Sequence, residues 1–325
     1  MQKVLILGAG SWGKALATVF SNQMDVELWI RDSDKINTIQ QDLVKITANQ
    51  IKCISNINVL NQYDLIIIAT PMNALRNMML MLLKFSNNLM EHLPDVFITC
   101  KGLEKSTGQL AYEVVTEVAP TISRYGILVG PSFASELIKG MPTLIALSSY
   151  NKDFTLKWIN SLQIPNFRIY GHSDVIGACA ASALKNVIAI AVGISYGLSL
   201  GQNTAAALIT RGIYEMKKFI IALGGTETSV YGLTGMGDLI LTCHEQSRNY
   251  KVGFQLAQGL TIDHIVNHLG QVAEGVSTAK EVYLKAQALQ IDMPISTTIY
   301  KIIYEQLNIK DAVLYLQTRP NKMEG

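Results

Sequence analysis

The sequence predicts two domains: a doubly wound α/β domain over residues 1–174, and an all-helical domain over residues 175–325. Three observations carry this prediction. Short β-branched apolar runs alternate with helical stretches up to about residue 174, as in a sheet that is covered on both faces. Beyond that point the alternation ends and long helical patterns follow one another. The chain has 325 residues, which is enough for two domains of ordinary size.

Six runs in the first part have the length and composition of strands. They are KVLIL (3–7), VELWI (26–30), DLIIIAT (64–70), DVFITC (95–100), GILVG (126–130) and TLIALS (143–148). A helical segment follows the third run at residues 72–83, and its methionines have the spacing of core residues. Because the strand runs are almost continuously apolar, we expect a sheet that is buried on both faces.

The second part predicts six helices and a frayed end. The helices are expected over 175–198, 203–223, 249–258, 262–269, 275–289 and 296–306, and the frayed tail over 317–325. The first helix is apolar enough to be mistaken for a membrane span. Lys185 lies near its middle, however, where insertion into a bilayer costs about 2.5–3.5 kcal/mol. We therefore expect a buried core helix and no membrane span.

The composition and net charge indicate which binding partners and which cellular compartment to expect. The formal net charge of +2 gives no argument for nucleic acid or a membrane surface as a partner. His264 and His268 lack further ligands nearby, and the cysteines form no C-x-x-C pair, so no metal site or disulfide framework is expected. Reduced thiols and the absence of a signal-peptide pattern favour the cytoplasm. A homodimer is left open. The four cysteines are Cys53, Cys100, Cys179 and Cys243.

The segment GAGSWG, residues 8–13, lies between the first predicted strand and a helix-favouring stretch. This context favours the Gly-x-Gly-x-x-Gly turn of a Rossmann-type dinucleotide site over a plain glycine turn. Gly8 permits the sharp turn, Gly10 lets the backbone approach a pyrophosphate, and Gly13 lets helix and strand pack closely. The free N–H groups of the helix N-terminus would then face the phosphates.

The end of the second predicted strand bears on the choice of cofactor. An acidic residue at this place binds the ribose 2′-hydroxyl of NAD. Here Arg31 comes first, eighteen residues after Gly13, and Asp32 follows it. A guanidinium suits the 2′-phosphate of NADP. We expect NADP or NAD as cofactor, with NADP favoured; use of both, and an Arg31 that is merely solvated, stay open.

Lys185 is predicted to lie on a helix among the small or apolar residues Ala181, Ser182, Ile188 and Ala189. Burial among such neighbours lowers the pKa of a lysine toward neutrality, so that it gives a proton to an oxygen and takes it back. The alternatives are a lysine whose ammonium reaches the surface and one that pairs with a distant carboxylate.

Two segments after predicted strands, CKGLE (100–104) and GPSFASE (130–136), offer Lys101 and Ser132 at places where α/β enzymes hold reacting groups. A third segment, GLTGMGDLILTCHEQSRN (232–249), begins with glycines that permit close approach of the backbone. Asp238 behind them is suited to pair with Lys185 or to bind a hydroxyl. Ser-Arg-Asn at its end is suited to a phosphate. The glycines are Gly232, Gly235 and Gly237, and the donor cluster is Ser247, Arg248 and Asn249.

Eight blocks in order resemble one family over nearly the whole chain, the bacterial NAD(P)-dependent glycerol-3-phosphate dehydrogenases. The blocks are GAGSWGKALA (8–17), KGLE (101–104), GPSFASE (130–136), ALKNVIAIAVG (183–193), NTAAALITRGIYEM (203–216), GLTGMGDLILTC (232–243), SRN (247–249) and AEGVSTA (273–279). The resemblance implies interconversion of dihydroxyacetone phosphate and sn-glycerol 3-phosphate, which supplies the backbone of phospholipids. The partner so implied is a small phosphorylated substrate.

The resemblance also implies a role for particular residues, with Lys185 as the catalytic proton donor and acceptor. The implied substrate contacts are Lys101, Gly130, Ser132, Lys185, Asp238, Ser247, Arg248 and Asn249. The implied cofactor contacts are Gly8, Gly10, Ser11, Trp12, Gly13, Arg31, Lys101, Ala134, Arg248 and Glu274.

The sequence departs from the family pattern in two places. The spacer HEQ before Ser247 is one residue shorter than expected, and the segment 49–58 lacks a Tyr/Phe-Leu-Pro pattern. Two other functions fit the sequence less well. A dehydrogenase of the 3-hydroxyacid or 6-phosphogluconate type is disfavoured by the block that runs from GMGDLILTC to SRN. A non-catalytic NADPH-binding sensor is disfavoured because both Lys185 and Asp238 are present.

Overall fold

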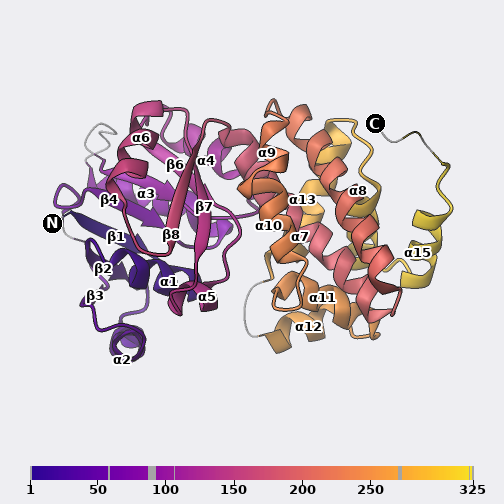
Figure 1. Ribbon diagram of the computed structural model, residues 1–325, viewed down its shortest axis with the longest axis horizontal. Coiled ribbons are helices and arrows are strands. Elements are labelled where there is room, and N and C mark those ends of the chain that lie inside the picture. The colour runs from indigo at the N-terminus through magenta and orange to yellow at the C-terminus, as the bar shows by residue number, and fades with distance from the viewer. Residues whose placement is uncertain are drawn as a thin grey trace.

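The computed structural model describes residues 2–57, 59–86, 93–105, 107–269, 273–321 and 323. A sheet with its covering helices occupies one side of the molecule, and a group of helices occupies the other (Figure 1). The chain passes from one to the other between the last strand, which ends at His172, and a long helix that begins at Val175.

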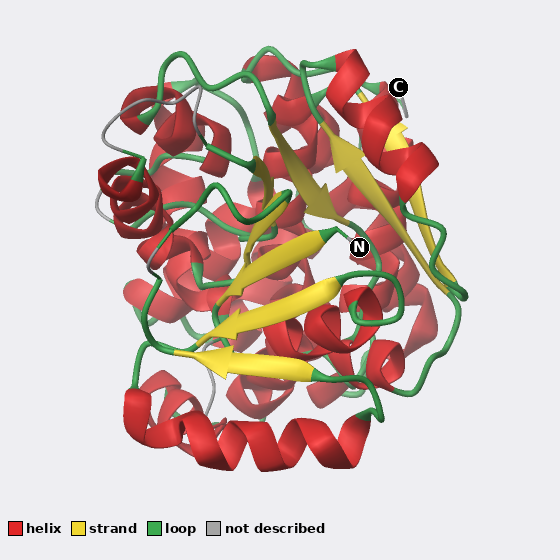
Figure 2. Cartoon of the chain, turned by 90° about the vertical axis from the view of Figure 1, so that its left-hand side faces the viewer, coloured by secondary structure: helices red, strands yellow, loops and turns green. Residues whose placement is uncertain are grey.

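The described residues form one eight-stranded sheet in the order β3-β2-β1-β4-β5-β6-β7-β8. The strands are β1 (Lys3–Leu7), β2 (Asp25–Trp29), β3 (Ile51–Ile54), β4 (Leu65–Ile68), β5 (Asp95–Ile98), β6 (Tyr125–Val129), β7 (Thr143–Ser148) and β8 (Phe167–His172). All neighbours pair in parallel except β6 and β7, which are antiparallel. Figure 2 shows the strands fanned across the domain with helices around them. The predicted α/β class is confirmed, and the edge strands β3 and β8 were not predicted.

Alternate residues of the central strands enter two different cores. In β1, Leu5 and Leu7 belong to the core under α3 and α4, whereas Val4 and Ile6 belong to the core under α1 and α6. This two-sided burial explains why the strand runs are continuously apolar. The covering helices are α1 (Ser11–Phe20), α2 (Ile36–Ile46), α3 (Leu75–Phe85), α4 (Ala111–Val118), α5 (Ala134–Ile138) and α6 (Lys152–Ser161).

The helix α7 (Val175–Gly197) is the centre of the second part. It has the length and hydropathy of a membrane span, but nearly all of it is buried against other helices. Glycines allow the closest contact: a Cβ on Gly193 would lie 2.0 Å from the carbonyl oxygen of Tyr250, and one on Gly253 would lie 1.9 Å from that of Ile190. The helices around α7 are α8 (Gly201–Ala222), α9 (Thr228–Tyr231), α10 (Asp238–Thr242), α11 (Arg248–Ala257), α12 (Ile262–Leu269), α13 (Glu274–Ala288), α14 (Pro294–Tyr304) and α15 (Ile309–Gln317).

The predicted long helices are present, with ends that differ by a few residues. Three shorter helices, α9, α10 and α15, were not predicted, nor was the π-helical turn over Leu233–Gly237. Within the predicted tail, helix α15 continues to Gln317, and residues 322, 324 and 325 lie outside the described residues.

Candidate active site

The glycine loop joins β1 to α1 and leaves the start of that helix open. Gly8 has φ +112°, a conformation that favours glycine, and a Cβ on Gly13 would lie 1.8 Å from the carbonyl oxygen of Gly8. Gly10 precedes the helix with no side-chain cap, and a Cβ there would meet nothing within 4 Å. The first N–H groups of α1 are therefore available to a ligand.

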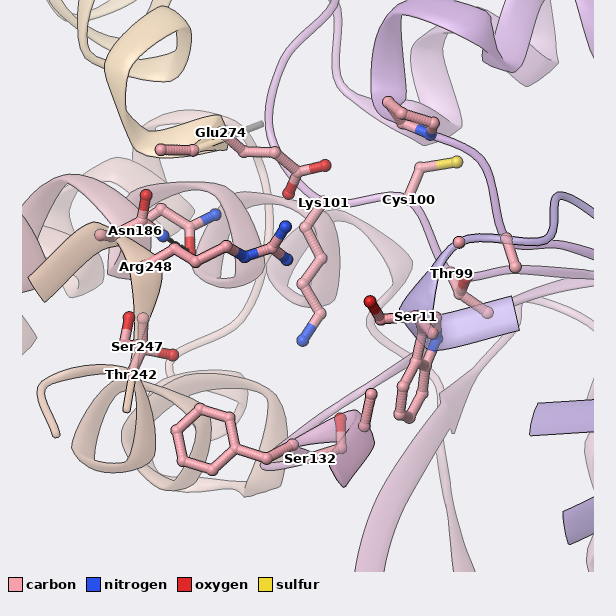
Figure 3. Close-up of a pocket in the computed structure, with 18 of the residues that line it drawn as sticks. Ser11, Thr99, Cys100, Lys101, Ser132, Asn186, Thr242, Ser247, Arg248 and Glu274 are labelled. Atoms are coloured by element: carbon pink, nitrogen blue, oxygen red, sulfur yellow. Dashed lines mark hydrogen bonds between the residues drawn. The ribbon is translucent and has the colours of Figure 1, made fainter. Parts of the chain in front are cut away.

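A cavity of about 580 Å³ lies where this loop faces the helical domain. Most of the predicted site residues line it, and they come from both parts of the chain. From the sheet domain these are Gly10, Ser11, Trp12, Lys101, Ser132 and Ala134, and from the helical domain Lys185, Asp238, Ser247, Arg248, Asn249 and Glu274. Figure 3 shows the side chains of Lys101 and Arg248 pointing into the space between Ser11 and Ser247.

Lys185 is buried on α7, with 4% of its surface exposed. Its Nζ lies 2.5 Å from Oδ1 of Asp238 and donates a hydrogen bond to Oγ1 of Thr242 at 2.9 Å. Burial lowers the pKa of Lys185 to about 7; Asp238 opposes this shift and the Lys101 ammonium adds to it. The alternative of a lysine that reaches the surface is wrong. The structure shows Lys185 paired with Asp238, and this pairing does not exclude proton transfer by the lysine.

Asp238 joins the two domains across the cavity. Its second oxygen, Oδ2, lies 2.9 Å from Nζ of Lys101, so one carboxylate bridges two ammonium groups. The carboxylate is 2% exposed, and Oγ1 of Thr242 donates to the Asp238 carbonyl at 2.6 Å. Two positive charges against one negative charge leave the cluster with an excess of positive charge when both lysines are protonated. Such an excess at a largely buried site attracts an anion.

The donor cluster begins α11. Ser247 is the N-cap, and its Oγ accepts a hydrogen bond from the backbone N–H of Tyr250 at 3.5 Å. The Asn249 amide donates to Oδ1 of Asn186 at 2.9 Å, and its oxygen accepts the N–H of Gly275 at 2.9 Å. Asn249 thus ties α11 to α7 and α13.

The guanidinium of Arg248 reaches into the cavity beside Glu274 (Figure 3). Burial raises the pKa of Glu274, and the positive charges of Lys101, Arg248 and Lys185 oppose that shift. Arg248 therefore offers its charge to the same space as the two lysines, from the opposite side to the glycine loop.

Four of the predicted site residues do not line the cavity. Gly8 and Gly13 determine the path of the loop but do not contact the cavity. The carbonyl oxygen of Gly130 accepts hydrogen bonds from Nζ of Lys101 at 3.4 Å and from Oγ of Ser132 at 3.0 Å. Arg31 is exposed just beyond β2, and the neighbouring Asp32 carboxylate pairs with Lys35 at 3.1 Å.

Of the three glycines before Asp238, Gly235 permits the expected close approach of the backbone. A Cβ on Gly235 would lie 2.2 Å from the carbonyl oxygen of Val230, so two backbone segments meet there. In the segment 49–58, β3 occupies Ile51–Ile54 and residue 58 lies outside the described residues. No described residue of that segment lines the cavity.

Asn186 and Thr242 line the cavity but were not predicted. Each lies beside a residue that was: Asn186 follows Lys185, and Thr242 is one helical turn after Asp238. That adjacency was the available signal. In the described part of the chain, no three His, Cys, Asp or Glu side chains gather in a way that would hold a metal ion, and all four cysteines are free.

Comparisons with known proteins agree over the whole chain. Residues 3–155 and 174–314 match the N-terminal and C-terminal family models of NAD-dependent glycerol-3-phosphate dehydrogenase. The NAD(P)+ glycerol-3-phosphate dehydrogenase of Methylobacillus flagellatus is 41% identical over 332 residues, with 99% of each chain covered. That of Aromatoleum aromaticum is 39% identical over 338 residues, covering 99% of this chain and 100% of the relative.

A solved structure extends the match to three dimensions. Glycerol-3-phosphate dehydrogenase from Coxiella burnetii superimposes with a TM-score of 0.87 at 32% identity, covering 98% of this chain and 99% of that one. These matches decide against an enzyme of the 3-hydroxyacid or 6-phosphogluconate type. The chain belongs to the family of NAD(P)-dependent glycerol-3-phosphate dehydrogenases.

Proposed function

We propose that this chain interconverts dihydroxyacetone phosphate and sn-glycerol 3-phosphate, with Lys185 as the group that gives and takes the proton. The observation that carries the proposal is the buried Lys185 ammonium, held 2.5 Å from Asp238 on the wall of a cavity shared by the two domains. A nicotinamide bound in this cavity would supply hydride to the ketone carbon, or would accept it from the alcohol carbon in the reverse direction. Supply of glycerol 3-phosphate for phospholipid synthesis follows from this reaction.

Lys185 is the residue that transfers the proton to and from the substrate oxygen. As the carbonyl carbon gains hydride, the C=O π bond breaks and negative charge develops on the oxygen. The ammonium stabilises that charge and transfers a proton from Nζ to the oxygen, forming the new O–H bond. In the reverse direction, the neutral amine takes the proton back. Asp238 holds the Lys185 ammonium in place, and Lys101 adds positive charge close to the developing alkoxide.

Arg248 is the proposed anchor of the substrate phosphate, supported by Ser247, by Ser132 near Gly130, and by the start of α11. A guanidinium binds phosphate through two parallel hydrogen bonds. Holding the phosphate orients a substrate of this small size, so it contributes to the rate as well as to affinity. The side chain of Asn249 is engaged by Asn186 and Gly275, and its proposed role is to fix this end of the cavity.

The dinucleotide fits the sheet side of the cavity. Two polar atoms there, Nε1 of Trp12 and Oγ1 of Thr70, are buried without a hydrogen-bond partner and offer contacts to a ligand. Gly10 and Ser11 would face the pyrophosphate, while Ala134 and Glu274 would lie beside the cofactor. We further propose that Arg31 binds the 2′-phosphate of NADP, which makes NADPH the preferred cofactor.

The same proposal assigns residues 1–174 to dinucleotide binding and residues 175–325 to the substrate and catalysis. It also places the enzyme in the cytoplasm as a homodimer. Exposed apolar side chains on the helical domain, including Leu314 and Tyr315 on α15, are compatible with an interface between copies. Light scattering of the purified protein measures that assembly.

The activity test is loss of reduced-nicotinamide absorbance with dihydroxyacetone phosphate, run with NADPH and NADH. Unphosphorylated dihydroxyacetone is the matched control. Fast turnover of the phosphate ester with slow turnover of the free ketone supports the proposal. Tight NADPH binding without turnover of either ketone would instead identify a non-catalytic sensor.

A further inference from the structure

Lys101 lies on a loop that is anchored at several points. The loop follows β5, and its described residues are 101–105 and 107–110. Gly102 has φ +100°, and a Cβ there would lie 2.9 Å from Oγ1 of Thr278 on α13. The loop therefore turns sharply against the helical domain, immediately after the lysine whose ammonium crosses to Asp238.

The side chain of Glu104, three residues after Lys101, fixes the loop from the sheet side. Nε of Arg76 on α3 donates to one Glu104 oxygen at 3.0 Å, and Nη2 donates to the other at 2.9 Å. Thr107 donates to the same carboxylate at 2.7 Å. The backbone of Glu104 closes the loop through its N–H to Gln109 and its carbonyl to Gly108, at 2.8 and 2.9 Å. A guanidinium fork holds a carboxylate in a defined geometry, so these contacts fix the loop at Glu104.

Arg76 links this loop to a second element. Its Nη1 lies 2.8 Å from Oε1 of Glu117 on α4, and its Nη2 donates to the Gln109 side chain. The far end of the loop is held from the helical domain, where Lys285 on α13 donates to Glu113 at 2.8 Å and to the Gly108 carbonyl at 3.2 Å. The loop thus joins both domains, and Arg76 is its main anchor on the sheet side.

We propose that Arg76, acting through Glu104, is a positioning residue for Lys101 and sets the distance of the Lys101 ammonium from Asp238. Without Arg76, the Glu104 carboxylate is left half-satisfied in a buried place and turns toward water, which draws the loop out of its present path. Lys101 then moves relative to Asp238 and to the substrate. This inference rests on the role proposed above for Lys101.

A double-mutant cycle tests it: Arg76→Met and Lys101→Met, singly and together, assayed as kcat/KM for dihydroxyacetone phosphate. We expect Arg76→Met to lower kcat/KM by roughly tenfold to a hundredfold, the order of effect of misplacing a catalytic group by about 1 Å. In the Lys101→Met background, the same change should alter kcat/KM by less than about twofold, because Arg76 acts through the residue already removed. A purely structural ion pair would give the same loss in both backgrounds.

Two further variants keep the test decisive. Glu104→Gln keeps the size and part of the hydrogen bonding of the carboxylate, and it replaces Arg76→Met in the cycle if the latter does not fold. Lys217→Met is the matched control: it removes a 2.7 Å ion pair with Glu227 on the surface of the helical domain and should leave kcat/KM within about twofold of wild type.

The outcomes distinguish the positioning role of Arg76 from the role that the proposed function gives to Lys101. Equal losses with and without Lys101 overturn the positioning role of Arg76 and leave the proposed function intact. Full activity of the Lys101→Met single variant overturns the role of Lys101 and the positioning role with it. A loss confined to the background that keeps Lys101 supports the inference.

Discussion

The two sides of the cavity present different chemical groups. On the sheet side, the loop at Gly10 and Ser11 offers backbone N–H groups and small side chains at the ends of strands. On the helical side, Lys185 and Asp238 bring buried charges from helices α7 and α10. The sheet side is suited to hold a ligand by shape and partial charge, and the helical side to move a proton. Changes at the glycine loop and at Lys185 should therefore separate cofactor binding from proton transfer.

The largest expected effect is on the helical side. Lys185→Met keeps the length and apolar fit of the side chain but removes the proton, so the protein should fold and still bind NADPH. Loss of general acid catalysis and of alkoxide stabilisation should lower kcat by roughly a thousandfold or more. The measurement is kcat, together with a cofactor titration and a thermal melt. A folded variant that binds NADPH and keeps more than about a tenth of wild-type kcat would refute the role of Lys185.

The degree of burial explains which strands the sequence predicts and which it does not. The central strands bury both faces, so their runs are continuously apolar and easily recognised. The edge strand β8 has alternating buried and exposed residues from Phe167 to Tyr170, and β3 has only four residues, of which Lys52 is exposed. Neither matches the pattern of a doubly covered strand. At the π-helical turn before Asp238, the glycines indicate a close approach of the backbone, which Gly235 makes to the Val230 carbonyl, but they do not indicate the type of helix.

For the site, too, the local motif was predictable from the sequence, whereas contacts between distant residues were not. The glycine loop is a local motif, because its three glycines lie within the six residues 8–13. The bridge from Asp238 to Lys101 and Lys185 joins residues that lie more than 50 positions apart in the chain. The sequence therefore raised the pairing of Lys185 with Asp238 only as one of two roles for the carboxylate. Asn186 and Thr242 were missed because an amide and a hydroxyl on apolar helices are ordinary in sequence. Only the fold turns them toward the cavity.

The next largest effect should come from Arg248. Arg248→Ala removes the guanidinium fork and should raise KM for dihydroxyacetone phosphate by roughly a hundredfold, with a smaller fall in kcat, as expected for charge-assisted hydrogen bonds to a phosphate. The unphosphorylated ketone should be a poor substrate for both enzymes and should hardly respond to the change. If both ketones lose equally, Arg248 is not the phosphate anchor.

On the sheet side, Arg31→Asp should affect binding and leave chemistry alone. The position is exposed and screened by solvent, so we expect NADPH binding to weaken by only about tenfold while NADH binding changes little. Fluorescence titration of each reduced cofactor measures this. Equal losses for the two cofactors would show that Arg31 does not read the 2′-phosphate, and the expected preference for NADP would lose its support.

The smallest and most specific effect concerns pH. Burial lowers the pKa of Lys185 to about 7, and Lys101 contributes to the lowering whereas Asp238 opposes it. Ketone reduction needs the ammonium form, so kcat/KM for reduction should be level below about pH 7 and fall toward tenfold per unit above it. Alcohol oxidation needs the neutral amine, so its kcat/KM should rise with pH up to the same region and then level off.

The break in the profile is the pH at which kcat/KM for reduction begins to fall. Two variants should move this break in opposite directions. Lys101→Met removes a positive neighbour, so the pKa of Lys185 and the break in the reduction profile should move to higher pH. Asp238→Asn removes the negative neighbour and should move both to lower pH, as far as its residual activity allows measurement. The profile of kcat/KM is the one to compare, because it reports the groups of the free enzyme, and titration of the substrate phosphate is common to all variants. A break that stays in place in both variants would mean that the titrating group is not the lysine bridged by Asp238.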